Sequence, residues 1–248
     1  ACPDLGGRAR FPALFHEISE RPMSIPFFSI VLPTYNRASL LDRALESVLA
    51  QSEPEWELLI ADDGSTDGSW ASLSDWARRD DRLRCWRHAN RGQAASRNEM
   101  LQHARAPWVV FLDSDDEFLP GHLALRREAI TSAPAVELWI SPMRIVGSPL
   151  VPCRLHPGEL IHIDRCVGAG MLTVRREALL KVGGFPDLSY AEDSALMTRL
   201  LAAGISCRRL PHRTYVYHRG HTDTITHNLL RAANAGRQLC ETAERRLT

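Results

Sequence analysis

The chain has 248 residues, which fits one large α/β domain with a modest extension. Hydrophobic residues make up 44% of it, enough for a packed core, and 30 basic and 30 acidic residues give a formal net charge of zero. A neutral chain gives no general case for nucleic-acid binding, so nucleic acid is not an expected partner. The six cysteines contain no C-x-x-C pair, which argues against a zinc site or a disulfide framework and favours a reduced, cytoplasmic setting.

The first half of the chain alternates strand-like and helix-like segments. Residues 27–32 are continuously apolar and partly β-branched, which is typical of a strand buried on both faces. The expected strands are residues 27–32, 56–61, 83–86 and 108–112, and the expected helices are residues 39–51, 68–79 and 94–104. This order predicts an α/β fold with a doubly wound, mostly parallel central sheet flanked by helices.

The second half is less regular. Residues 141–170 are rich in proline and glycine and predict irregular structure. Further expected elements are a strand at 171–174, a helical turn at 176–181, a helix at 191–203 that ends at Gly204, a strand at 214–217 and an arginine-rich helix at 228–247. The last helix is expected to pack on the domain, with peripheral contact at the inner face of a membrane as the alternative.

Polar clusters follow three of the predicted strands. They occupy residues 33–36, 62–65 and 113–115. In open parallel sheets, ligands bind beyond the carboxyl ends of the strands. We therefore expect these clusters to share one binding site.

Asp113-Ser114-Asp115 sets two carboxylates two residues apart at a strand end. Mn²⁺ and Mg²⁺ prefer oxygen ligands and commonly take one or two carboxylates, with substrate phosphates and water completing the shell. The alternative is a solvated acidic turn that caps the helix after Pro120. A lone D-x-D pattern favours that alternative, so the context has to decide.

Other motif residues also allow two interpretations. Asp62-Asp63 can recognise a base or ribose, or form a β-turn and helix cap. Glu192-Asp193 can supply a general base, or complement the dipole of the helix it begins. Arg97 can reach a phosphate or orient an acid, or lie on a solvated helix face.

Histidines gather late in the sequence. His218 and His221 follow the predicted strand at 214–217. Imidazole is a ligand for several transition metals, so one of the two can complete a metal shell or contact a phosphate. The alternative is a structural or exposed histidine.

Taken together, these segments resemble the family 2 inverting glycosyltransferases, which have the GT-A fold. The resemblance covers roughly residues 27–227. It rests on six segments in the expected order: SIVLPTYNR (29–37), LLIADDGSTDGS (58–69), NRGQAASRNEML (90–101), WVVFLDSDDEFLPGHL (108–123), VRREALLKVGGFP (174–186) and YAEDSALMTRLLAAG (190–204).

The resemblance implies a role for each matching residue. Asp193 is the expected catalytic base, and Glu192 orients it or binds the acceptor. Asp115 is the expected direct metal ligand, with Asp113 and His221 as further candidates and His221 favoured slightly over His218. The implied nucleotide-sugar contacts are Pro33, Thr34, Tyr35, Asp63, Arg97, Asp113 and Ser114.

The resemblance also implies a domain plan. Residues 1–26 are expected to be a leader, residues 27–227 the glycosyltransferase domain and residues 228–248 a C-terminal helix. Within the domain, residues 27–135 form the nucleotide-binding half and residues 136–227 the acceptor-binding half.

The expected function is metal-dependent, inverting transfer of a hexosyl or N-acetylhexosaminyl group from a nucleotide-sugar to an acceptor hydroxyl in glycan or polysaccharide synthesis. The implied donor is a UDP-sugar, the cofactor is Mn²⁺ or Mg²⁺, and the acceptor is a glycan, a lipid-linked glycan or a small molecule. Two alternatives are a catalytically silent nucleotide-sugar-binding module and a metal-dependent phosphohydrolase. The hydrolase is disfavoured because Asp116-Glu117 follows the D-x-D motif.

Overall fold

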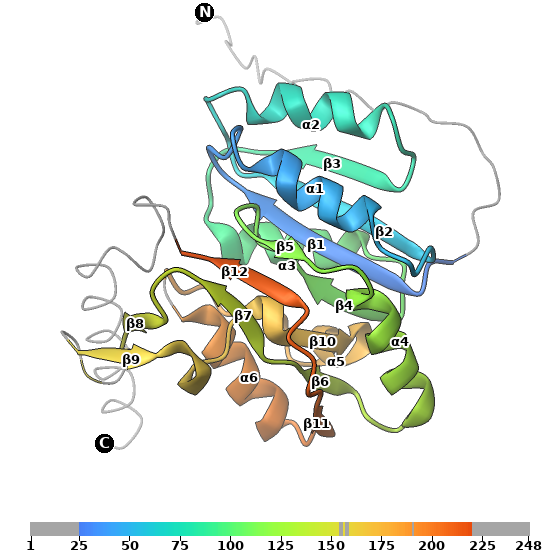
Figure 1. The fold of residues 1–248 in the computed structure, drawn as a ribbon, viewed down its shortest axis with the longest axis vertical. Helices are drawn as coiled ribbons and strands as arrows, with labels where there is room; N and C mark the ends of the chain where they lie inside the picture. The colour runs from blue at the N-terminus through green and yellow to red at the C-terminus, as the bar shows by residue number, and fades with distance from the viewer. Residues whose placement is uncertain (1–24, 154–155, 157–158, 190, 220–248) are drawn as a thin grey trace, which may run out of the picture.

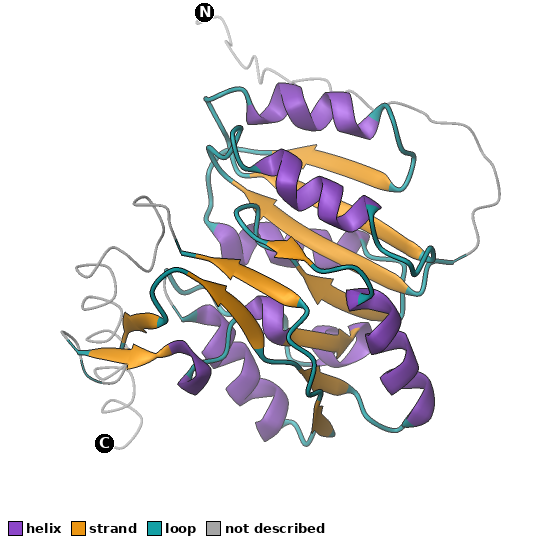
Figure 2. Cartoon of the chain, in the orientation of Figure 1, coloured by secondary structure: helices purple, strands orange, loops and turns teal. Residues whose placement is uncertain are grey.

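A seven-stranded sheet forms the centre of the molecule (Figures 1 and 2). The structure, a computed structural model, describes residues 25–153, 156, 159–189 and 191–219. The strand order in the sheet is β11-β6-β10-β4-β1-β2-β3. The strands are β1 (Phe28–Thr34), β2 (Trp56–Asp62), β3 (Leu83–Arg87), β4 (Trp108–Phe111), β6 (Leu138–Ile140), β10 (Leu172–Arg175) and β11 (Cys207–Arg209).

The predicted mostly parallel sheet is confirmed. β1 pairs in parallel with both β2 and β4, and β2 pairs in parallel with β3. β10 is the exception, because it runs antiparallel to its neighbours β4 and β6. All residues of β1, β2 and β4 are buried, as expected for strands covered on both faces.

Helices flank the sheet. In Figure 1, α1 lies in front of β1 and β2, and α3 lies behind the sheet. The helices are α1 (Leu41–Leu49), α2 (Ser69–Ala77), α3 (Gln93–His103), α4 (His122–Ser132), α5 (Arg176–Lys181) and α6 (Glu192–Ala202). Each predicted helix that falls on described residues forms within two residues of its expected ends. The helix expected at 228–247 and residues 1–24 of the leader expected at 1–26 lie outside the described residues.

The prediction of irregular structure for residues 141–170 is wrong. This region contains β7 (Met143–Val146), β8 (Leu150–Pro152) and β9 (Leu160–His162), with 3₁₀ turns η1 (Ile163–Arg165) and η2 (Ala169–Met171). β8 and β9 pair as an antiparallel hairpin. β7 joins a second sheet of order β5-β12-β7, with β5 (Glu117–Phe118) and β12 (Tyr215–His218). Tertiary pairing thus overrides a composition that favours loops.

The register of the central strands decides where their polar ends meet. Thr34 at the end of β1 is paired with Asp62 at the end of β2. The amide of Leu112, just after β4, donates to the carbonyl of Val31 in β1. The three predicted polar clusters therefore emerge at one edge of the sheet.

Among the residues that the structure describes, no helix combines the length and the apolar character that crossing a membrane requires.

Candidate active site

A cleft of about 840 Å³ opens at the carboxyl ends of β1, β2 and β4. Asp63, Asp115 and Asp193, far apart in the sequence, all line it. The expectation that the polar clusters after the three strands share one site is therefore confirmed, and Asp193, the base that the family resemblance implies, lies in the same cleft. The described candidate residues that line the cleft are Pro33, Thr34, Tyr35, Asp63, Arg97, Asp113, Ser114, Asp115, Glu192 and Asp193. His221 lies outside the described residues.

Arg97 connects three acids of the cleft. It belongs to α3 and is only 1% exposed, so it does not lie on a solvated helix face. Its Nη1 donates to Glu192 at 2.9 Å and to Asp193 at 3.1 Å, and its Nη2 donates to Asp113 at 2.7 Å. Phe185 supports the guanidinium, with its ring centroid 5.1 Å away. One cation thus joins the D-x-D motif to the Glu-Asp pair.

The charges around Arg97 shift two pKa values. Burial alone would lower the pKa of Arg97, but the three carboxylates outweigh burial and raise it. Burial, assisted by the charges of Glu192 and Asp113, raises the pKa of Asp193 to about 8 against the opposing charge of Arg97. A carboxylate with a raised pKa is a stronger base near neutral pH.

The chain enters α6 in an unusual conformation. Ala191 has a φ of 60°, in the left-handed region that non-glycine residues seldom adopt. The next two residues are Glu192 and Asp193, and Glu192 is 2% exposed and also accepts a hydrogen bond from Gln93. Strained backbone of this kind is found most often at functional sites.

The D-x-D loop is held from both sides. Arg43 of α1 donates to the backbone carbonyl of Asp115, and Nε of Arg37 lies 4.0 Å from Oδ2 of Asp115. Asp116, the next residue, is fully buried and accepts hydrogen bonds from the hydroxyl of Tyr215 at 2.6 Å and from the amide of His218 at 2.8 Å. Burial and the adjacent acids raise the pKa of Asp116 well above its usual value.

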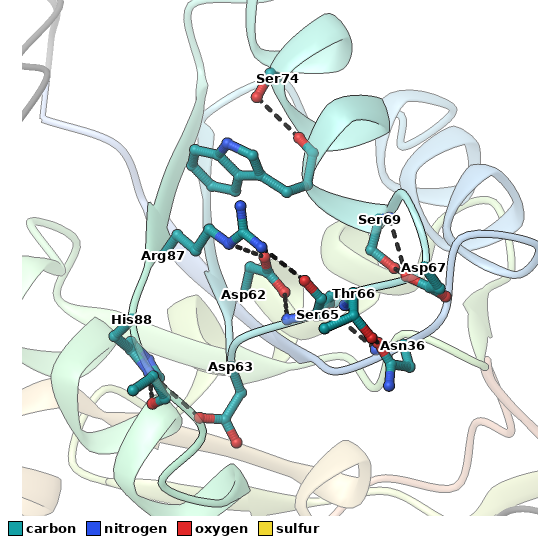
Figure 3. A network of polar contacts seen from close by, with 12 residues as sticks. Asn36, Asp62, Asp63, Ser65, Thr66, Asp67, Ser69, Ser74, Arg87 and His88 are labelled. Atoms are coloured by element: carbon teal, nitrogen blue, oxygen red, sulfur yellow. Dashed lines mark hydrogen bonds and ion pairs between the residues drawn. The ribbon is translucent and has the colours of Figure 1, made fainter.

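The end of β2 has two neighbouring acids with different surroundings (Figure 3). Asp62 is fully buried, accepts the amide of Ser65 at 3.0 Å and lies 3.2 Å from the guanidinium of Arg87. This acid stabilises the turn, as the turn-and-cap interpretation expects. Asp67, further along, accepts the amide of Ser69 at the start of α2.

Asp63 directly follows β2 and lines the cleft, and its side chain points away from the turn that Asp62 stabilises (Figure 3). Its two oxygens accept the amides of Arg91 and Gly92 at 2.7 and 2.8 Å, and Nδ1 of His88 lies 3.3 Å from it. A carboxylate has about four acceptor sites, so these bonds leave capacity for a ligand. Asp63 therefore fixes the loop before α3 and still faces the cleft.

Residues 34–36, at the end of β1, contribute both buried and exposed side chains to the cleft. Oγ1 of Thr34 is buried and has no hydrogen-bond partner among the described residues. Tyr35 is 46% exposed at the cleft, and Asn36 accepts the amide of Thr66 at 2.8 Å. An unsatisfied buried hydroxyl beside a cleft is consistent with a polar ligand group.

His218 does not line the cleft. Its Nε2 lies 2.9 Å from Oε1 of Glu117, an interaction that fits the structural interpretation of this histidine. Over the described part of the chain, no cluster of three or more histidine, cysteine or acidic side chains is arranged to hold a metal ion.

The opposite wall of the cleft is largely apolar. It is built from described residues between Met143 and Gly170 and from Met197 of α6. Its apolar side chains include Met143, Val151, Ile161, Ile163, Val167 and Met197.

The sequence reasoning missed three residues of the site. Gln93 and Tyr215 line the cleft and bond to site acids, and Asp116 anchors the D-x-D loop. The sequence did signal Asp116, because a third acid directly follows the D-x-D motif. Gln93 and Tyr215 carried no signal, because their partners are about a hundred residues away.

Two family models match the chain. The model described as glycosyl transferase family 2 matches residues 29–145, and the model described as N-terminal domain of galactosyltransferase matches residues 155–222. Together they span both walls of the cleft.

Curated relatives share this sequence pattern. The chain is 30% identical over 188 residues to TuaG of Bacillus subtilis, which is assigned to teichuronic acid biosynthesis as a glycosyltransferase; the match covers 73% of this chain and 74% of TuaG. It is 33% identical over 102 residues to the Campylobacter jejuni GalNAc(5)-diNAcBac-PP-undecaprenol beta-1,3-glucosyltransferase, covering 40% of this chain and 33% of that enzyme. The chain spans only 15% of an uncharacterised glycosyltransferase of Rickettsia felis.

Solved structures share the fold. Staphylococcus aureus TarS 1–349 in complex with UDP-GlcNAc superposes with a TM-score of 0.68 at 23% identity, covering 78% of this chain and 59% of that chain. The mannosyltransferase PcManGT of Pyrobaculum calidifontis, in complex with GDP-Man and Mn²⁺, superposes with a TM-score of 0.64 at 25% identity, covering 92% and 67%.

Proposed function

The chain belongs to glycosyl transferase family 2, and we propose that it transfers a sugar from a UDP-sugar to an acceptor hydroxyl, with inversion at the anomeric carbon and with a divalent metal bound. The observation that carries this proposal is the convergence of Asp113, Glu192 and Asp193 on the buried Arg97. This convergence places Asp193, the expected base, and the D-x-D motif, which is expected to bind the diphosphate, in the same cleft.

Asp193 is the proposed general base. Its side chain is 20% exposed and lines the cleft, and its raised pKa makes the ionised form of Asp193 a stronger proton acceptor than an ordinary carboxylate. Asp193 takes the proton of the acceptor hydroxyl, whose oxygen forms a bond to the anomeric carbon. The bond from that carbon to the diphosphate breaks on the opposite face, and the diphosphate leaves with the electron pair. Glu192 and Arg97 hold the base in place.

Asp115, with Asp113 beside it, is the proposed holder of Mn²⁺ or Mg²⁺. The residues fit such an ion in the form in which one or two carboxylates bind it and substrate phosphates and water complete the shell. Asp113 already accepts a bond from Arg97, so Asp115 is the better candidate for direct contact. When bound, the ion offsets the negative charge that grows on the leaving diphosphate.

The nucleotide is proposed to lie against the first loop and the end of β2. The unpartnered hydroxyl of Thr34, the exposed ring of Tyr35 and the carboxylate of Asp63 line this part of the cleft. Pro33 and Ser114 complete the proposed contacts. The UDP-GlcNAc complex of TarS supports a nucleotide-sugar donor of the UDP type, and the GDP-Man complex of PcManGT makes a GDP-sugar the alternative for the donor panel.

The acceptor is proposed to be a glycan, free or lipid-linked, in the synthesis of a polysaccharide. The relatives assigned to teichuronic acid biosynthesis and to an undecaprenol-linked glycan support this class. Residues 136–227 form the proposed acceptor-binding half and residues 27–135 the nucleotide-binding half.

A donor panel tests the function. The protein is incubated with Mn²⁺, a set of nucleotide-sugars and a mixture of glycan acceptors, and release of nucleoside diphosphate is measured. We expect release that depends on acceptor. Binding without release would indicate the silent module, and release of inorganic phosphate without acceptor would indicate the phosphohydrolase.

A further inference from the structure

Tyr215 bonds to the D-x-D loop through its hydroxyl. The residue lies in β12 and is 1% exposed. Its hydroxyl accepts the amide of Asp113 at 3.2 Å and donates to Oδ2 of Asp116 at 2.6 Å. One oxygen atom therefore fixes both ends of the segment that contains Asp115. A phenylalanine would fill the same volume and make neither bond.

The ring of the same residue contacts the other side of the cleft. A Cβ atom at Gly170, in η2, would stand 2.2 Å from Cε2 of Tyr215, far inside van der Waals contact. The preceding residue, Ala169, lines the cleft together with Asp193, and its backbone amide helps to lower the pKa of that acid. Gly170 therefore lets the η2 turn, which lines the cleft beside the proposed base, pack directly on the tyrosine ring.

We infer that Tyr215 is a positioning residue that couples the diphosphate-binding loop at Asp113–Asp116 to the η2 turn beside Asp193. The role of this loop in binding diphosphate rests on the proposed function. The placement of the loop by the tyrosine hydroxyl does not, because it follows from the two hydrogen bonds alone.

Removal of the hydroxyl takes one partner from each of two groups. In Tyr215→Phe, the amide of Asp113 loses its acceptor, and the carboxylate of Asp116 keeps, among the described residues, the bond from the amide of His218 alone. Unsatisfied buried groups are costly, so the loop is expected to shift or to admit water. Asp115, between these anchors, then loses its fixed position.

Ser29 offers a matched control at the other end of the sheet. Its buried hydroxyl donates to the carboxylate of Glu57 at 2.7 Å and accepts the amide of Ala106 at 3.1 Å, which are the same two kinds of bond. Ser29 does not line the cleft. Ser29→Ala therefore reports the general cost of losing a buried hydroxyl, with no effect on the loop.

The first experiment compares Tyr215→Phe, Ser29→Ala and the wild type by calorimetry with UDP and Mn²⁺ and by thermal unfolding. We expect both variants to unfold at a lower temperature. Only Tyr215→Phe should bind UDP in Mn²⁺ more weakly, by roughly tenfold. Wild-type affinity in Tyr215→Phe would overturn the positioning role.

Hydrogen exchange on the ligand-free proteins separates this inference from the proposed function. Amides of residues 113–116 should exchange faster in Tyr215→Phe and at the wild-type rate in Ser29→Ala. If the wild type does not bind UDP, the proposed function fails, and the exchange result still decides the inference. Unchanged exchange at these amides would overturn it.

A double-mutant cycle tests the contact with Gly170. Gly170→Ala should displace the ring of Tyr215 and speed exchange at residues 113–116. In the Tyr215→Phe background, where the hydroxyl bonds are already absent, Gly170→Ala should add little exchange at these amides. Fully additive effects would show that η2 does not act through Tyr215.

Discussion

Two buried charge networks lie at opposite ends of the central sheet. At the amino ends, Glu57 is fully buried and accepts bonds from Ser29, Arg84 and Arg105. At the carboxyl ends, one buried cation, Arg97, is shared by three acids. The first network supplies four donor groups to an acid that has about four acceptor sites. The second network has more acids than its cation can neutralise.

Because the two networks differ in the ratio of donors to acids, the pKa of Glu57 and the pKa of Asp193 shift in opposite directions. Burial would raise the pKa of Glu57, but the bonds from the Arg105 amide, Ser29 and the Arg105 guanidinium outweigh it and lower the pKa. At the other end, the single guanidinium does not offset burial and like charge, and the pKa of Asp193 is raised to about 8. A network in which every acid has enough donors stabilises the fold. A network with too few donors keeps the pKa of one acid high enough for that acid to act as a base.

The largest expected effect is on the rate of transfer. Asp193→Asn keeps the size of the side chain but cannot take the acceptor proton. We expect the turnover rate to fall by about 10²–10⁴-fold while the UDP affinity, measured by calorimetry, is retained. Glu57→Gln, the matched acid-to-amide change in the other network, should leave turnover close to wild type. Near-normal transfer by Asp193→Asn would remove this residue from the role of base.

The next effect is on stability. Arg97→Met leaves three acids without their shared cation, and loss of one partner from a buried ion network costs about 3–5 kcal/mol of unfolding free energy. Urea denaturation followed by circular dichroism measures this loss. Arg97→Lys, which keeps the charge without the planar fork, should recover part of it. Equal stability of Arg97→Met and wild type would contradict the electrostatic account.

A smaller loss is expected at the other end of the sheet. Glu57→Gln removes the charge between Arg84 and Arg105, but their side chains are 33% and 41% exposed and can turn to water. The unfolding free energy should fall by about 1–2 kcal/mol, measured in the same urea assay. A loss as large as that of Arg97→Met would mean that the two networks are equally dependent on pairing.

The smallest expected difference concerns the free energy of unfolding, which should change with pH in opposite directions for the two acids. The folded pKa of Glu57 is lowered, so its stabilisation is present above the unfolded value of 4.5 and is lost as the pH falls through the folded pKa. The folded pKa of Asp193 is raised, so its stabilisation is complete below 3.8 and is lost as the pH rises toward about 8.

Urea denaturation from roughly pH 2 to pH 9 separates the two contributions. Asp193→Asn should flatten the decline in stability toward alkaline pH, and Glu57→Gln should flatten the decline toward acid pH. An unchanged alkaline decline in Asp193→Asn would assign it to a different group.

The sequence predicts the architecture of the first half well because its signals are local. Buried parallel strands read as continuous apolar runs, and the polar clusters that follow them mark the ligand-binding edge. The strand order also indicates that Asp63 and Asp115 meet, since each follows a strand of the parallel sheet, whereas the placement of Asp193 beside them came from the family resemblance. The direction of β10 was not predicted, because an isolated strand carries no mark of its orientation.

The features that the sequence did not predict depend on contacts between distant segments, which no local sequence pattern encodes. β5 has two residues and β6 and β11 have three, which is too short for a periodic signal. The hairpin of β8 and β9 is apolar on the side that faces the cleft, but its prolines and glycines are typical of loops. Arg97 bonds to Glu192 across 95 residues, so its role as a shared cation requires the folded chain.

The left-handed backbone of Ala191 limits how this site can be re-engineered. Glycine adopts that conformation readily and asparagine or aspartate tolerates it, whereas valine and isoleucine are almost excluded. A library aimed at new acceptors can therefore vary Ser194 and Met197, which line the cleft from α6, while position 191 is restricted to alanine, glycine, asparagine and aspartate. Variants with a branched residue there should be lost at the folding step, before any selection for specificity.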